Sequence, residues 1–476
     1  MSDSFDTVRE KFENAMFRLR CDDPFLDALS LGSMDLGPAG ATALADALQA
    51  NTRLQELYLS DNDIGDAGAA ALAAALKGNK SLQVLVLRNN NIGDKGAAAL
   101  ADALNGDTCL QDLDLGGNHI GDEGAAALAT ALKANKNLDE LDLGENHIGP
   151  DGVRALVAAL KGDTSLRVLY LHDIGIGDTD SLFPDALNYN TFLEELVLYG
   201  KDTSIGDALA ALFAEVLEVN KSLQELDLGG NDIGDAGAAT LARALEVNES
   251  LQELDLGDND IGDAGAAALA RALEVNKSLE KLNLRENDIG NNGVADLARA
   301  LKANTSLQSI NLGYNIIDDD GAIKVAHALM DNTSLQRLYL DHNDVCLPGA
   351  AALAGALKDN TGLHTLDLNY NDVGDKGATA LARALMGNTS LQHLRLVYND
   401  IGDEGATAFA TALKGNNTCV YALNLRKNRI GPTGGGALAN AFTSNTSLQR
   451  LCLGENNIGA AHAATIAHTK RERFTH

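Results

Sequence analysis

The chain has 476 residues, and its composition is strongly acidic and poor in aromatic side chains. Aromatic residues make up 4% of the chain, tryptophan is absent, and 47 glycines accompany a mostly aliphatic apolar fraction, a mixture that suits many thin repeated layers better than one thick core. A net charge of −30 argues against nonspecific binding to nucleic acid or to acidic membrane surfaces, because like charges repel.

The first element expected is an amphipathic helix over residues 4–20. Phe5, Val8, Phe12, Met16 and Leu19 recur there at helical spacing, so they form one apolar face. Because the open end of a repeat array exposes core, we expect residues 1–25 to be an N-terminal cap. The acidic residues of this helix argue against the alternative, a helix that lies on a membrane surface.

A repeat of about 28 residues occupies residues 26–476. Its sixteen units begin at residues 26, 54, 82, 110, 138, 166, 193, 223, 251, 279, 307, 335, 363, 391, 420 and 448. Self-similarity at such a period is typical of a solenoid, in which each unit buries its apolar side only against its neighbours.

Each unit is expected to begin with a short strand. In the second unit, Leu54, Leu57 and Leu59 point inward, the last two with the period of two that a strand requires. Asn62, at the ninth position, follows the strand, where a buried amide can satisfy backbone groups of neighbouring turns. Thirteen of the sixteen units have this asparagine, and the exceptions are Met34, Ile174 and Lys201. A second recurring asparagine, before each strand, creates glycosylation sequons at Asn79, Asn220, Asn248 and Asn276, which we interpret as structural because they follow the repeat.

Each unit is expected to end with a helix. Ile64, at the eleventh position, enters the core, and Gly65 and Gly68 permit a tight turn. The helix GAAALAxAL then presents Leu72 and Leu76, four residues apart, to the core, while its alanines let adjacent helices pack closely.

The pattern LxxLxLxxNxIGDxGAxALAxAL resembles the ribonuclease-inhibitor-like class of leucine-rich repeats, which also occurs in the tails of NOD-like receptors. The resemblance covers residues 26–476. It implies an α/β fold, a right-handed solenoid or horseshoe with a parallel sheet on the concave face, helices on the convex face, and partners held in the concavity. No GxxxxGK[ST] motif is present, which excludes a full NOD-like receptor.

Two consecutive units are irregular between His172 and Gly206. The unit at 166 is one residue shorter than the usual repeat and has Pro184 in its helix. The next unit is two residues longer than the usual repeat and has Lys201 in place of asparagine. A local kink, a ridge that contacts a partner, and tolerated drift are all compatible with this pattern. At the other end, Lys470 replaces a helix leucine, which predicts a polar end cap, although the basic KRERFTH sequence could instead be a localisation signal.

Motifs for chemistry are weak. The loops DNDIGDAG invite a calcium interpretation, but glycine precedes the third aspartate and the EF-hand glutamate is missing, so turn chemistry explains them better. His119 and His147 occupy the same position of adjacent units without a third ligand. We therefore expect no catalytic residue, cofactor or metal. Five cysteines without a regular spacing, and no apolar leader or membrane-spanning run, favour a reduced, cytoplasmic protein.

The positions that the repeat does not fix are the candidate binding residues. The third and fifth positions alternate with core leucines and face the concave side, and the seventh and eighth flank them. Acidic columns (Asp112, Asp114, Glu140, Asp142, Glu195, Glu225, Asp227, Glu253, Asp255) give way to cations (Lys281, Arg285, Arg337, Arg395, Arg426, Lys427, Arg450). Four successive units carry Tyr314, His342, Tyr370 and Tyr398 at the eighth position, so the repeat should stack them as one stripe. Tyrosine and arginine are enriched at interface hot spots.

These columns predict a non-catalytic scaffold that binds a protein partner on its concave face as a monomer. The predicted contact residues are Tyr314, Arg337, Tyr339, His342, Tyr370, Arg395 and Tyr398, with Glu225, Asp227, Glu253 and Asp255 steering the partner's basic side. Solvated variation among the acids, and rings that merely shield one another, are the alternatives.

Two other functions remain open. LVLRNNNIGDKGA, from Leu85 to Ala97, is similar to a stretch of the Ran GTPase-activating family around Asn89 and Asn90, which would imply GTPase activation. The acidic columns would also suit an inhibitor of a basic enzyme.

Overall fold

The structure, a computed structural model, describes residues 2–106, 108–162, 164–175, 182–200, 206–414 and 418–465, and side chains from residue 9 onward. The chain divides into two compact units, Met1–Asn231 and Asp232–His476.

The first unit contains helices α1 to α8 and strands β1 to β8. The helices are α1 (Ser2–Arg20), α2 (Gly37–Leu48), α3 (Gly65–Leu76), α4 (Asp94–Leu104), α5 (Asp122–Ala134), α6 (Pro150–Leu160), α7 (Leu182–Leu187) and α8 (Gly206–Val219). The strands are β1 (Ala28–Ser30), β2 (Glu56–Tyr58), β3 (Val84–Val86), β4 (Asp112–Asp114), β5 (Glu140–Asp142), β6 (Val168–Tyr170), β7 (Glu195–Val197) and β8 (Glu225–Asp227).

The second unit repeats the same alternation. Its helices are α9 (Asp235–Leu245), α10 (Asp263–Val275), α11 (Asn291–Ala303), α12 (Asp319–Leu329), α13 (Leu347–Leu357), α14 (Gly374–Leu385), α15 (Asp403–Lys414) and α16 (Pro432–Ser444). Its strands are β9 (Glu253–Asp255), β10 (Lys281–Asn283), β11 (Ser309–Asn311), β12 (Arg337–Tyr339), β13 (Thr365–Asp367), β14 (His393–Arg395), β15 (Ala422–Asn424) and β16 (Arg450–Cys452).

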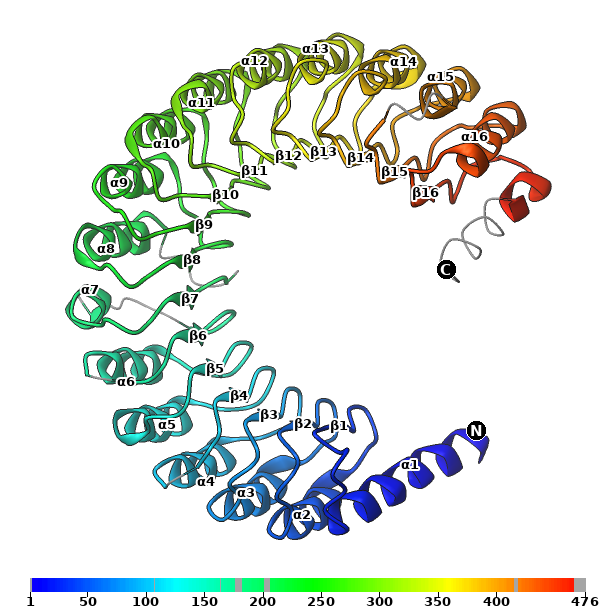
Figure 1. The fold of residues 1–476 in the computed structure, drawn as a ribbon. Helices are drawn as coiled ribbons and strands as arrows, with labels where there is room; N and C mark the ends of the chain where they lie inside the picture. The colour runs from blue at the N-terminus through cyan, green and yellow to red at the C-terminus, as the bar shows by residue number, and fades with distance from the viewer. Residues whose placement is uncertain are drawn as a thin grey trace. The chain divides into compact units, whose positions relative to one another are not determined.

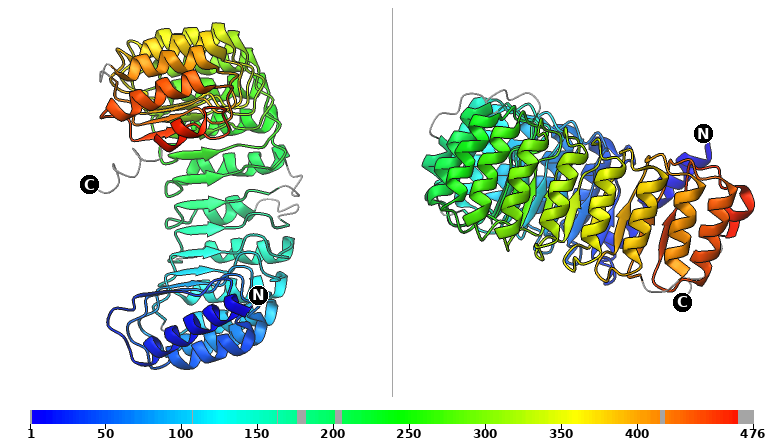
Figure 2. Two further views of the ribbon diagram at one scale, coloured as in Figure 1. Left: turned by 90° about the vertical axis from the view of Figure 1, so that its right-hand side faces the viewer. Right: turned by 90° about the horizontal axis from the view of Figure 1, so that it is seen from above.

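Within each unit the strands form one parallel layer and the helices a second (Figures 1 and 2). Successive strands pair one repeat apart, as Glu56, Leu57 and Tyr58 pair with Val84, Leu85 and Val86. The middle residue of each strand, Ile310 in β11 and leucine in the others, is buried, and the residues on either side face away from the helices, as the period of two requires. This confirms the predicted α/β solenoid of strand–helix repeats.

Two ladders of buried asparagines connect the repeats. The amide of Asn62 donates to the carbonyl oxygens of Leu31 (2.8 Å) and Leu59 (2.9 Å), while its oxygen accepts from the Met34 N–H (3.0 Å). The ninth-position asparagine thus forms hydrogen bonds with the backbone of the preceding repeat. The first repeat has Met34 at this position, and no repeat precedes it. The second ladder includes Asn79, whose amide donates to the Leu48 carbonyl oxygen at 2.9 Å. Asn79, Asn220, Asn248 and Asn276 are buried, which confirms that the sequons are structural.

The loop aspartates cap the helix of the following repeat. Asp66 Oδ1 accepts from the Gly93 N–H at 2.7 Å and from the Gly96 N–H at 2.9 Å. N–H groups at the start of a helix such as α4 have no acceptor within the helix itself. The same arrangement recurs at Asp94, Asp122, Asp235, Asp263, Asp319, Asp375 and Asp403. Cap chemistry therefore accounts for Asp66 and Asp263, the third aspartates of the two loops that resembled a calcium site. Among the residues with described side chains, no three histidine, cysteine or acidic residues gather as a metal site.

The glycine at the fifteenth position permits close packing of consecutive helices. A Cβ added to Gly68 would lie 2.5 Å from Ile64 Cγ2 and 2.8 Å from Ala41 Cβ. Glycine is therefore required by the approach of α2 and α3.

The interruption of the repeat falls on α7. Within the described residues this helix spans six positions and includes the buried Pro184. Strand pairing continues through it, because Val168 pairs with Glu195 and Glu195 with Glu225. Lys201 lies outside the described residues.

The N-terminal segment is helical, as the apolar spacing predicts. Met16 and Leu19 of α1 are buried, and α1 contacts α2. The side chains of Phe5 and Val8, and Lys470 at the other end, lie outside the described residues. No helix in the described part of the chain is long and apolar enough to cross a membrane.

Candidate partner-binding surface

Four aromatic side chains of the second unit stack as a continuous ladder. The ring centroids of Tyr314 and His342 lie 3.6 Å apart, those of His342 and Tyr370 4.0 Å apart, and those of Tyr370 and Tyr398 5.3 Å apart. The rings are within 21° of parallel in every pair. The stacked stripe predicted from the 28-residue spacing is confirmed, and we call these four residues the aromatic ladder.

The backbone at the ladder positions does not favour aromatic residues. Tyr314, His342, Tyr370 and Tyr398 have φ values from 51° to 54°, in the left-handed region where glycine, asparagine and aspartate are most readily accommodated. Other units have Asn89, Gly117, Asp258, Glu286 or Lys427 at the same position, also with positive φ. The turn therefore does not select tyrosine, and a bulky residue in this region is a reason to look for a function.

A buried carboxylate fixes one end of the ladder. Asp341, 7% exposed, accepts from Arg285 Nη1 at 2.6 Å and lies 3.0 Å from His342 Nδ1. The guanidinium of Arg285 lies over the Tyr314 ring, 4.3 Å from its centroid. Tyr314 is thus held between a cation and an imidazole. The sequence places Arg285 only in the cationic column and does not single out Asp341, although their two-repeat separation at the seventh position is a usable signal.

The strand face beside the ladder carries the other predicted contacts. Tyr339 on β12, Asp367 on β13 and Arg395 on β14 are register neighbours. Asp367 is 3% exposed, and its carboxylate accepts from Arg395 Nη1 at 3.1 Å. Burial raises the pKa of Asp367, partly offset by its hydrogen bond from the Asn369 N–H.

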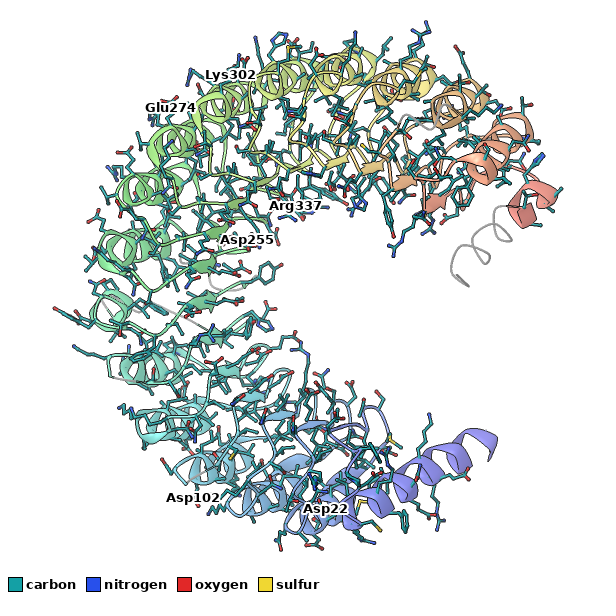
Figure 3. The ribbon with its side chains drawn as sticks, in the orientation of Figure 1. Asp22, Asp102, Asp255, Glu274, Lys302 and Arg337 are labelled. Atoms are coloured by element: carbon teal, nitrogen blue, oxygen red, sulfur yellow. The ribbon has the colours of Figure 1, made fainter. Side chains whose placement is uncertain are left out.

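Arg337 is one cation of the strand face. It makes no ion pair among the described residues, and Figure 3 shows it on the strand side of the second unit, as it does Asp255. Glu274 and Lys302, by contrast, lie on the helix side (Figure 3). Arg337 is therefore presented to a molecule that lies on the strands.

An open groove of about 810 Å³ lies at the other end of the ladder. Tyr370, Tyr398, Asp372, Lys427 and Glu455 are among its lining residues. Lys427 Nζ lies 3.5 Å from the Tyr370 hydroxyl and 3.9 Å from Glu455 Oε2. The groove is thus lined by aromatic side chains and by charged groups of both signs.

The predicted acidic columns have local roles that the sequence did not reveal. Asp227 and Asp255 each accept from a glycine N–H two residues later, at 2.8 Å, which closes the turn after the strand. Asp255 also accepts from Asn283 Nδ2 at 2.7 Å, and Glu253 pairs with Lys281. Glu225 on β8 is exposed. These acids therefore contribute to turns and strand pairs as well as to surface charge.

The acids of β4 and β5 form a separate cluster in the first unit. Asp112 pairs with Glu140 and Asp114 with Asp142 in the parallel register. Burial, reinforced by neighbouring carboxylates, raises the pKa of Asp112 to about 6 and that of Glu140 to about 7. In both carboxyls the protonated form is more stable than it would be in a free side chain, because burial and neighbouring negative charge penalise ionisation.

Two other predicted features lie in the first unit. His119 and His147 stack with ring centroids 5.1 Å apart, which confirms their predicted proximity. Asn90, from the stretch similar to GTPase-activating proteins, is fully buried and donates to the Leu59 carbonyl oxygen at 2.9 Å. Asn89 donates to Asp61 Oδ1 at 3.1 Å. Asn90 is therefore a ladder residue of the fold.

Comparison with known proteins agrees with this repeat geometry. The family described as Leucine Rich repeat matches residues 50–73, 78–101, 106–129, 134–157, 219–242, 247–270, 275–298, 303–326, 331–354, 359–382, 387–410 and 416–439, more than half of the chain. The unmatched stretch between 157 and 219 contains the irregular units. No curated protein sequence matches the chain.

Solved structures also resemble it. An internalin (inlF) from Listeria monocytogenes str. 4b F2365 is similar with 20% identity and a TM-score of 0.43, over 86% of this chain and 92% of that one. The actin-binding site 2 of leiomodin-1 is similar with 24% identity and a TM-score of 0.26, over 28% of this chain and 77% of that one. Leucine-rich repeats support a general role as a protein-binding scaffold, and no enzymatic family is indicated. With its repeated strands, asparagine ladders and matched segments, the chain belongs to the leucine-rich-repeat family.

Proposed function

We propose that this protein is a non-catalytic cytoplasmic scaffold that binds a protein partner on the strand face of its second unit. The aromatic ladder carries the proposal, because bulky rings occupy four consecutive left-handed positions that the turn does not require them to fill. Tyr314 is 40% exposed and Tyr398 60%, so a partner can reach the ladder. Tyrosine is a frequent hot-spot residue because it combines contact area with a polar hydroxyl.

The proposed contact surface comprises the ladder and the adjacent residues of β12 and β14. Arg337, Tyr339 and Arg395 lie beside the ladder in register positions that face away from the core. Glu253 and Asp255 of the second unit add negative charge that attracts a basic side of the partner before contact, and Glu225 and Asp227 of the first unit carry charge of the same sign. The scaffold acts as a monomer, without metal or cofactor. Within its family we assign it to the ribonuclease-inhibitor-like class, because strands recur every 28 residues, as at Lys281 and Ser309.

The proposal is tested by mapping a bound partner. The intact chain serves as bait in a cell extract, the recovered protein is purified, and hydrogen–deuterium exchange is measured with and without it. We expect the partner to protect peptides that contain Tyr339, Tyr370 and Arg395. Protection confined to the helices, or to the acidic cluster of the first unit, would refute the assigned surface. A recovered GTPase whose hydrolysis the chain accelerates would instead establish the alternative function.

A further inference from the structure

The aromatic ladder has one closed end and one open end. At the closed end Tyr314 is covered by the Arg285 guanidinium, 4.3 Å from the ring centroid. At the open end Tyr398 stacks on Tyr370 alone among the described rings, and 60% of the residue is exposed. No cation lies over the Tyr398 ring within the described part of the chain. Tyr398 is therefore largely exposed to solvent, in a groove that it shares with Lys427.

The closed end shows which group this ladder accepts. Arg285 combines a planar contact with Tyr314 and a 2.6 Å hydrogen bond to the Asp341 carboxylate. A guanidinium is suited to both contacts because it is flat, permanently charged and carries several N–H donors in one plane. The fold itself thus contains one example of an arginine at the end of this stack.

The groove at the open end supplies the same two chemical features. It is lined by Tyr398 and by Asp372, whose exposed side chain makes no ion pair or hydrogen bond among the described residues. The other two carboxylates of the groove are already paired, Asp400 with Arg429 and Glu455 with Arg426.

The groove also contains cations, and each of them lies close to a carboxylate. Arg429 is paired with Asp400, and Lys427 Nζ lies 3.9 Å from Oε2 of Glu455, which Arg426 also contacts. Among the described residues, Asp372 is the charged lining residue of the groove that has no ion pair. Together with a net charge of −30, it favours a cationic occupant.

We propose that the open end of the aromatic ladder binds an arginine side chain of a protein partner, with the guanidinium over Tyr398 and paired with Asp372. This site rests on the proposed function and specifies its chemistry. The groove volume of about 810 Å³ is large enough for an arginine together with neighbouring residues of an extended segment. Lysine fits less well, because its compact ammonium neither stacks on a ring nor presents a planar set of donors.

The experiment uses peptides, so that it does not depend on the natural partner. Three fluorescent octapeptides carry arginine, lysine or citrulline at the same three positions in a glycine–serine background, and anisotropy is measured with the full chain at 150 mM salt. We expect the arginine peptide to bind about threefold to tenfold more tightly than the lysine peptide. Tyr398→Ala and Asp372→Asn should each abolish this preference. Asp260→Asn removes an exposed carboxylate from the same repeat position outside the groove, and it should leave the preference intact.

A variant of Lys427 distinguishes a cationic occupant of the groove from an anionic one. Lys427→Ala should strengthen binding of the arginine peptide or leave it unchanged, whereas an anionic occupant would lose affinity. Equal binding of the arginine and lysine peptides to the parent chain, or a preference that survives in both groove variants, overturns the proposal. That result would refute the arginine site alone, because the proposed strand-face interaction is measured separately by exchange with the recovered partner.

Discussion

Glutamine in place of Glu140 is expected to stabilise the first unit above neutral pH. Glu140 on β5 lies opposite Asp112 on β4, and burial together with this neighbour raises its pKa from 4.5 to about 7. An acid whose pKa is raised by folding binds a proton more tightly in the native state than in the unfolded state. Its contribution to stability is therefore present below pH 4.5 and is lost as the pH rises to about 7.

The magnitude follows from the size of the pKa rise. At 1.36 kcal/mol per unit, a rise from 4.5 to about 7 corresponds to about 3 kcal/mol. Because Glu140 is only half-buried, solvent screening reduces the expected effect to about 1–2 kcal/mol. Glu140→Gln cannot ionise, so the loss should disappear in this variant.

The assay is urea denaturation followed by circular dichroism at pH 5.5 and pH 8, with hydrogen exchange of the β4 and β5 amides as a local readout. The parent chain should be less stable at pH 8, and Glu140→Gln should show a smaller difference. Glu225→Gln, at the same strand position but exposed on β8, is the matched control and should behave like the parent. The reasoning is refuted if the variant and the parent lose the same stability between the two pH values.

Three further substitutions test the structural roles assigned above. Asn259→Ala should lower the free energy of unfolding by about 1–3 kcal/mol, because the Ile233 N–H loses its 2.9 Å acceptor; an unchanged denaturation midpoint would show that the amide is dispensable. Asp263→Ala should cost about 0.5–2 kcal/mol, since it removes the cap of α11, and exchange protection at the start of that helix should fall with it. Arg395→Ala leaves the buried Asp367 without its ionic partner, so the loss of stability should be larger at pH 8 than at pH 4; a loss independent of pH would contradict this.

The repeat made most of the fold predictable. Strands, inward-facing leucines and buried asparagines follow from one 28-residue pattern, because every unit buries its apolar side against its neighbours in the same way. The role of Asp66 was less accessible, since its acceptor bonds go to the next repeat and the local sequence suggests only a turn. The same pattern could not place residues 172–206, where two consecutive units depart from it and α7 contains Pro184.

The candidate site was predictable in part. Equal spacing was enough to stack Tyr370 on Tyr398, but it could not show that their backbone is left-handed. The partner of Arg285 and the position of Asp372 in the groove depend on side-chain directions, which the repeat pattern alone does not give. For the same reason, Asp227 and Asp255 were interpreted as surface charge alone, whereas each also closes the turn after its strand.

The central claim, that the aromatic ladder binds the partner, is tested most directly by the affinity of a double variant. Binding of the purified partner is measured by isothermal titration calorimetry for the parent, for Tyr370→Ala with Tyr398→Ala, and for Glu225→Gln with Glu253→Gln. The ladder variant should keep its fold and lose about 2 kcal/mol or more of binding free energy, whereas the acidic variant should lose less. If the ladder variant binds as tightly as the parent while the acidic variant does not, the partner binds at the acidic columns and the assignment is wrong.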